Sequence, residues 1–128
     1  MEETIYEKSM KFAVRIVKLS QYLRESKEEY VLSKQVLRSG TSIGANAAEA
    51  RQAKSKREFI AKMSISLSEA SETEFWLELL YRSEYLKSEE YESMAEDSRE
   101  LEKILTAIVK TSRKREEEDS EDKKNCQL

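Results

Sequence analysis

The chain contains no proline, no histidine and only two glycines among its 128 residues. Proline and glycine mark the turns and irregular edges of sheet proteins, so their scarcity favours long uninterrupted helices. Without histidine, the chain lacks the commonest metal ligand and the base of Ser-His-Asp and Cys-His catalytic arrangements. We therefore expect an all-α protein that is not an enzyme and holds neither a metal nor another cofactor.

Cysteine and long apolar runs are also scarce. The single cysteine, Cys126, cannot form a disulfide within the chain, which fits a reducing compartment. The first apolar run, from Phe12 to Val17, is short and contains Arg15, so we expect neither a signal sequence nor a membrane-spanning segment. These features predict a soluble cytoplasmic protein of a single folded domain.

Capping signals and apolar spacing predict four helices. Three of them open with a Ser/Thr-x-x-Glu capping box, at Thr4, Ser26 and Ser55, and Ser88 is followed by two glutamates that favour a helix start. The expected helices span residues 5–25, 28–53, 56–86 and 89–114. We expect an antiparallel up-and-down four-helix bundle over residues 1–113, followed by a disordered charged tail over residues 114–128.

The first expected helix has more apolar surface than a monomeric bundle buries. At about 100° per residue, its apolar residues cover an arc of roughly 220°. The residues that widen this arc beyond the core face are Tyr6, Met10, Ala13, Val14 and Val17. The arc indicates a subunit interface, and the alternative is a few exposed apolar residues of the kind found on any surface.

The second expected helix contains a block of small residues at 39–48 that includes both glycines, Gly40 and Gly44. A glycine inside a helix costs roughly 1 kcal/mol relative to alanine, so two of them indicate close approach of another helix. That helix belongs either to the same bundle or to another subunit, and both interpretations stay open. The candidate residues for an oligomer interface are Tyr6, Met10, Val14, Val17, Gly40 and Gly44.

Charge is segregated along the chain although the formal net charge is only −3. Residues 30–62 contain seven basic and two acidic side chains, whereas residues 63–112 contain five basic and twelve acidic ones. Flexible cations spaced along a surface bind phosphates without reading base sequence. The candidate nucleic-acid-binding residues are Lys8, Lys11, Arg15 and Lys18 on one face of the first helix, with Lys54, Lys56 and Arg57 near the start of the third.

The alternative interpretation of these cations is a solvated surface on which they pair with nearby acids, for example Arg15 with Glu7 and Lys62 with Glu58.

The third helix also carries four glutamates, Glu69, Glu72, Glu74 and Glu78. Because helical dimetal sites need Glu-x-x-His pairs, we expect these glutamates on a polar face, with one or two bonded to Gln35, Asn46 or Arg51. Trp76 is expected to anchor the core or an interface.

Three ordered blocks carry a family resemblance: residues 32–50 (LSKQVLRSGTSIGANAAEA), 55–60 (SKREFI) and 69–80 (EASETEFWLELL). With them the chain resembles the four-helix bundle family named for proteins encoded in intervening sequences of bacterial 23S rRNA genes. That family is similar to the accessory protein of diversity-generating retroelements, a homopentamer that binds nucleic acid and works with a reverse transcriptase. The resemblance implies a pentamer that binds structured RNA or DNA, with a reverse transcriptase or another protein as a possible partner. The competing hypothesis is a helical scaffold that binds a protein and no nucleic acid.

Overall fold

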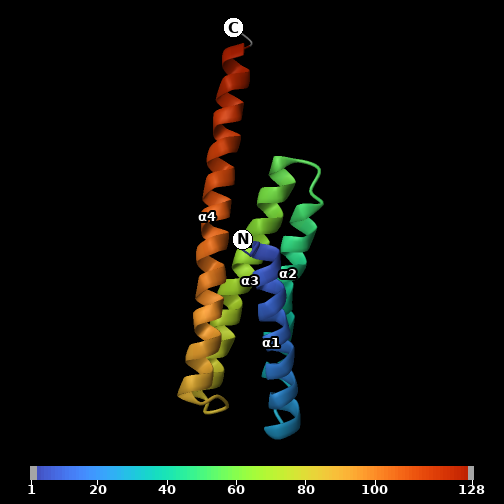
Figure 1. The fold of residues 1–128 in the computed structure, drawn as a ribbon, viewed down its shortest axis with the longest axis vertical. Coiled ribbons are helices and arrows are strands. Elements are labelled where there is room, and N and C mark those ends of the chain that lie inside the picture. The colour runs from blue at the N-terminus through green and yellow to red at the C-terminus, as the bar shows by residue number, and fades with distance from the viewer. Residues whose placement is uncertain (1–2, 127–128) are drawn as a thin grey trace.

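The computed structural model describes residues 3–126, which form four helices and no strand (Figure 1). The helices are α1 (Ile5–Ser26), α2 (Leu32–Arg51), α3 (Lys56–Arg82) and α4 (Ser88–Cys126). Successive helices run antiparallel and are joined by short connections, which confirms the predicted all-α architecture. None of these helices is both long enough and apolar enough to cross a lipid bilayer.

Two of the predicted N-cap residues start helices as expected, Thr4 with a complete capping box and Ser55 with the hydroxyl bond alone. The hydroxyl of Thr4 accepts the N–H of Glu7 at 3.1 Å, and the Glu7 carboxylate accepts the N–H of Thr4 at 3.3 Å. The hydroxyl of Ser55 accepts the N–H of Glu58 at 3.1 Å. These bonds satisfy N–H groups that have no partner within the helix, and they therefore fix where α1 and α3 begin.

The predicted start of the second helix at Ser26 is wrong, because α1 continues through Ser26 and α2 begins at Leu32. The cap of α2 is the carboxylate of Glu29, which accepts the N–H groups of Val31, Leu32 and Ser33 at 3.1, 2.9 and 2.7 Å. Glu29 reaches them because the chain turns at Glu28, whose φ is 53°. A long side chain thus caps α2 from the connection that precedes the helix.

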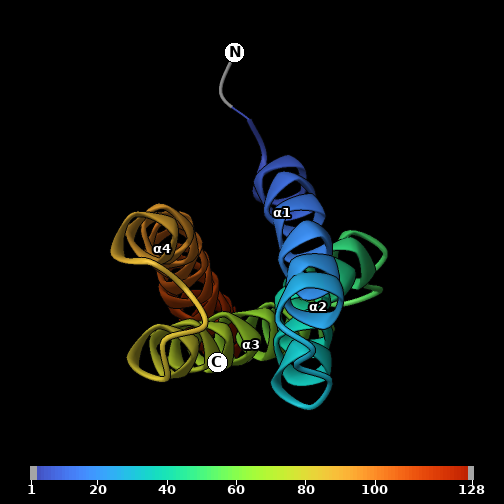
Figure 2. The same ribbon diagram turned by 90° about the horizontal axis from the view of Figure 1, so that it is seen from below.

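The helices pack in sequence, α1 on α2, α2 on α3 and α3 on α4, whereas α1 and α4 contact each other much less. Viewed from below, α1 and α4 diverge on one side of the molecule (Figure 2). The core between the helices contains completely buried side chains from all four, among them Ile16, Ile43, Leu77 and Leu105. The bundle is therefore closed on three sides and open along the seam between α1 and α4.

Both glycines of α2 face α1 of the same protomer. A Cβ atom at Gly40 would lie 2.7–2.9 Å from three carbons of the Ile16 side chain, and one at Gly44 would lie 3.3 Å from the Cβ of Ser9. Packing within the bundle therefore accounts for both residues. A further role for them between subunits stays a prediction.

The last helix is longer than the sequence led us to expect. Residues expected to form a disordered tail from position 114 onward are helical as far as Cys126, and α4 projects well beyond the other helices (Figure 1). This segment has no glycine or proline, and lysine, arginine and glutamate are strong helix formers. Its basic run 113–115 also lies one turn before the acids at 117–119, so opposite charges are four residues apart. Residues 127 and 128 lie outside the described part of the chain.

Candidate nucleic-acid interface

The basic residues predicted on α1 are mostly paired with acids. The Nζ of Lys8 lies 2.5 Å from an Oε of Glu100, and the Nζ of Lys11 lies 2.5 Å from an Oε of Glu3. Three of the four predicted cations, Lys8, Lys11 and Arg15, are paired in this way. Lys18 is exposed and forms no ion pair within the described part of the chain.

Arg15 binds α4 rather than its own helix. Its guanidinium lies 2.5 Å from a carboxylate oxygen of Asp97 and donates to the hydroxyl of Ser93 at 2.8 Å. The predicted pairing with Glu7 is therefore wrong, and so is that of Lys62 with Glu58, because Lys62 lies 2.8 Å from Glu49. The ion pairs of Lys8 and Arg15 join α1 to α4 along one stretch of the seam. In these pairs, carboxylates neutralise two of the cations that we predicted to bind phosphate.

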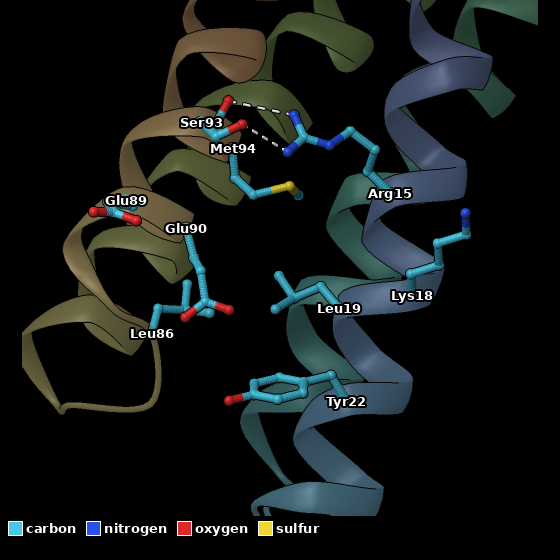
Figure 3. A pocket seen from close by; sticks show the side chains of 9 residues that line it. All are labelled: Arg15, Lys18, Leu19, Tyr22, Leu86, Glu89, Glu90, Ser93 and Met94. Atoms are coloured by element: carbon cyan, nitrogen blue, oxygen red, sulfur yellow. Dashed lines mark hydrogen bonds between the residues drawn. The ribbon is translucent and has the colours of Figure 1, made fainter.

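Beyond Arg15, the same seam widens into a cleft of about 580 Å³. Its apolar side chains include Leu19 and Met94, and Figure 3 shows the Arg15 side chain extending from α1 to Ser93 of α4. Lys18 lies at the cleft together with Glu89 and Glu90, so both signs of charge line it. A cleft of mixed charge offers no net attraction to a polyanion.

The other predicted cations lie where α2 ends and α3 begins, at a surface that we call the basic corner. It comprises Arg51, Lys54, Lys56, Arg57 and Arg115. Lys56 forms an ion pair with Asp119 of α4, and the lysine holds the pKa of the Asp119 carboxyl below its usual value. Lys54, Arg57 and Arg115 form no ion pair with any side chain among residues 3–124. Arg51, Lys54 and Arg115 therefore keep their positive charge, whereas Lys56 and Arg57 also line a pocket that contains Glu116, Asp119 and Asp122.

Sequence reasoning missed Arg51 and Arg115 as members of this corner. The guanidinium of Arg51 lies 4.4 Å from the ring centroid of Tyr6, a cation–π contact that leaves the positive charge in place. Arg115 reaches the corner because α4 remains helical beyond residue 114 and passes beside the start of α3. The signal in the sequence was the Arg-Lys-Arg run at 113–115, which we assigned to a tail.

The predicted interface residues of α1 divide into two groups. Met10, Val14 and Val17 have exposed fractions of 48%, 48% and 41% and form the outer stripe of α1. Tyr6 is half-buried and contacts Arg51 as described above. The outer stripe is therefore apolar surface that the protomer leaves in contact with solvent.

The glutamates of α3 form ion pairs, but not with the partners expected. Arg38 of α2 binds Glu69 at 3.0 Å and also binds Glu72, while Arg99 of α4 binds Glu74 at 3.1 Å. The predicted bonds to Gln35, Asn46 or Arg51 are wrong for these glutamates; the amide of Asn46 instead donates to the carbonyl oxygen of Ser42 at 2.8 Å. Within the described residues, no three acidic or cysteine side chains come together in a way that could hold a metal ion.

Trp76 lies against the hydrophobic core and is partly buried. Its indole N–H donates to the Glu72 carboxylate at 3.3 Å. An aromatic ring that packs on the core while its polar atom is hydrogen-bonded near the surface is a typical anchor.

The described residues form a small antiparallel helical bundle with a cluster of basic side chains where α2 ends and α3 begins. The sequence model of the family described as 23S rRNA-intervening sequence protein matches residues 1–107, and the chain belongs to that family. A crystal structure from Bacteroides thetaiotaomicron VPI-5482, of a protein with unknown function from the S23 ribosomal protein family, is similar to it with 55% sequence identity and a TM-score of 0.83. The similarity covers 84% of this chain and 99% of that one. No curated protein matches the sequence.

Proposed function

We propose that the protein is a non-enzymatic bundle that binds structured RNA through the basic corner. The observation that carries this proposal is the convergence of Lys54, Arg57 and Arg115, from the α2–α3 connection, α3 and α4, without a paired acid among the described side chains. The resemblance to a nucleic-acid-binding accessory protein supports the same class of ligand.

The binding mechanism is electrostatic. Lysine and arginine side chains that contact phosphates release condensed counterions, so affinity falls as salt rises and depends little on base sequence. The cations of α1 contribute less, because Lys8, Lys11 and Arg15 would first have to leave their carboxylate partners. A local cationic surface operates in this way even though the formal net charge of the chain is −3.

The test compares two triple variants that lose the same charge. Lys54→Gln, Arg57→Gln and Arg115→Gln neutralise the basic corner, whereas Lys34→Gln, Lys87→Gln and Lys103→Gln remove three exposed lysines elsewhere. Fluorescence anisotropy with a labelled RNA hairpin is recorded over a range of salt concentrations. We expect the corner variant to lose at least about tenfold in affinity at low salt and its log–log salt slope to decrease by roughly two to three.

The control variant should retain most of the affinity and slope of the wild type. Equal losses in the two variants would show that only overall charge matters and would contradict the proposed interface. Absence of binding by the wild-type protein at low salt would contradict the function itself.

We also propose that the outer stripe of α1 joins protomers into a homo-oligomer, which the resemblance implies is a pentamer. Exposed Met10, Val14 and Val17 lie on one face of α1, and a continuous apolar stripe of this kind is typical of an interface. A symmetric assembly would repeat the basic corner once per subunit and increase its avidity for one RNA. The competing function, a scaffold for another protein such as a reverse transcriptase, would cover this stripe with a different chain and needs no RNA.

A further inference from the structure

The basic corner contains a cavity of about 520 Å³. Its walls come from the end of α2, the connection to α3, the first turn of α3 and the passing part of α4. Sites for small organic ligands commonly have volumes of 300–1,000 Å³. The cavity is therefore large enough to receive one nucleotide, whereas a flat basic patch would only contact a backbone.

The lining of this cavity combines two kinds of surface. Positive charge comes from Arg51, Lys54, Lys56 and Arg115, and among the described residues no acidic side chain lines the cavity. Lys56 is bound to Asp119. The positive charge available to a ligand therefore comes from Arg51, Lys54 and Arg115.

Apolar groups form another part of the wall, beside the polar Ser55 and Ser112. The ring of half-buried Phe59 lies there with the methyl groups of Ala50 and Ala53. A ligand with an anionic group at one end and a flat, largely apolar body matches both surfaces. A nucleotide has this composition, with its phosphate and its base.

The α1–α4 cleft has a similar volume but different chemistry. Glu89 and Glu90 line it together with Arg15 and Lys18, so an anionic ligand would meet like charge there. Size alone therefore does not distinguish the two cavities. Their linings do, because among the described residues no acidic side chain lines the 520 Å³ cavity.

The concave shape of the cavity also restricts the form of RNA that can enter. In a paired helix, the bases lie inside the stack and phosphates face outward, so a base enters a protein cavity only when its nucleotide leaves the stack. We propose that the cavity holds one unpaired nucleotide, with its phosphate near Arg51, Lys54 and Arg115 and its base against Phe59. This inference rests on the proposed function and adds a preference for bulged over fully paired RNA.

The experiment compares two RNA hairpins that differ in one position. One has a single adenine bulge, and in the other that adenine is paired with an added uridine. Because aromatic stacking of one base contributes measurably to affinity, we expect the wild-type protein to bind the bulged hairpin about tenfold more tightly. The preference should be seen at constant salt by fluorescence anisotropy.

Two variants locate the preference. Phe59→Leu removes the aromatic ring but keeps apolar volume, and Ala53→Phe fills the cavity from the connection without changing charge. Both should bind the paired hairpin as the wild type does and lose the preference for the bulge. The matched control is Phe75→Leu, which changes an exposed aromatic ring of α3 outside the cavity and should keep the preference. Thermal unfolding of each variant shows that the bundle is intact.

Equal affinity of the wild type for the two hairpins would overturn the inference and leave the proposed function standing. A preference for the bulged hairpin that survives in both Phe59→Leu and Ala53→Phe would likewise overturn the inference and leave the proposed function standing. Failure of the wild type to bind either hairpin at low salt would instead overturn the proposed function and, with it, this inference.

Discussion

Gly40 and Gly44 lie one turn apart on α2 and face α1 at different distances. A Cβ at Gly40 would lie only 2.7–2.9 Å from carbons of the branched Ile16 side chain, which is completely buried. At Gly44 the nearest atoms are the Cβ and backbone of Ser9, at 3.3 and 3.6 Å. An added Cβ would therefore meet a side chain of α1 at Gly40, whereas at Gly44 it would lie near the α1 backbone.

Alanine substitutions should distinguish the two glycines. We expect Gly40→Ala to destabilise the protein by about 1–3 kcal/mol, because overpacking a core costs more than the added helix propensity returns. The free energy of unfolding of Gly44→Ala should stay within about 0.5 kcal/mol of that of the wild type. The cost of a small shift at Ser9 should be offset by the higher helix propensity of alanine. Urea unfolding followed by circular dichroism measures both, and equal effects would contradict the difference in packing.

A second residue-level feature is a pair of carboxyl groups between α3 and α4. Burial, together with a hydrogen bond to Glu74, raises the pKa of Glu102 from 4.5 to about 7. The hydroxyl of Ser71 donates to Glu102 at 2.9 Å, and Arg99 lies on the other side against Glu74 at 3.1 Å. Near neutral pH the two carboxyl groups therefore share a proton.

This pair predicts a pH dependence of stability. Because the pKa of Glu102 is raised in the folded state, its contribution is complete below the ordinary value of 4.5 and is lost as the pH rises through about 7. Glu102→Gln should therefore raise the unfolding temperature at pH 8 and flatten the profile between pH 5 and 8. Glu96→Gln, an exposed carboxyl on the same helix, should leave the profile unchanged. A profile for Glu102→Gln that follows the wild type would contradict this account.

At the scale of elements, the start of α2 depends on a single side chain. Glu29 is 9% exposed and accepts three successive N–H groups, so it replaces the Ser or Thr that usually caps a helix. Val31, at the N-cap position itself, makes no side-chain hydrogen bond. The first turn of α2 is therefore held by the connection that precedes it.

Removal of this cap should loosen the start of α2. We expect Glu29→Ala to cost about 1–2 kcal/mol, since three helix-end donors lose their acceptor, and Glu29→Gln to cost less because one oxygen remains. Hydrogen exchange of the amides of residues 31–33 measures the local effect. Unchanged exchange in Glu29→Ala would show that water satisfies these donors equally well.

At the scale of the whole molecule, the outer stripe of α1 lies on the side of the helix that no other helix covers. Met10, Val14 and Val17 are each more than two-fifths exposed, whereas Ile16 and Leu23 on the opposite face of the helix are completely buried. The bundle therefore has a complete core without the stripe. A change there should alter assembly and leave the protomer folded.

The assembly proposal predicts a particle larger than one 15.0 kDa chain. Met10→Lys with Val14→Lys should convert it to a monomer, because charged side chains in an apolar interface lose hydration without a partner. The control is Val31→Lys, which changes an exposed valine in the α1–α2 connection and should keep the oligomer. Light scattering coupled to size exclusion measures the mass, and a wild-type monomer at micromolar concentration would contradict the proposal.

Much of the fold could be predicted from the sequence, because the patterns that specify its helices involve residues close together in the chain. Apolar spacing and the capping boxes at Thr4 and Ser55 operate within one or two helical turns, and they predicted the number and order of the helices. The start of α2 was not accessible in this way, because Glu29 caps it only after the chain reverses at Glu28. The length of α4 was underestimated because apolar spacing carries no information about a charged helix with an exposed surface.

The sequence by itself determined the helical class of this protein, the block of small residues in α2 and the basic segments along the chain. Only the tertiary structure decided which cations stay available. Lys8 and Arg15 meet carboxylates that are 92 and 82 residues away along the chain, while Arg115 joins Lys54 where α4 passes the start of α3. Electrostatic interactions depend on distance in space, and for residues on different helices that distance is set by packing rather than by position in the sequence.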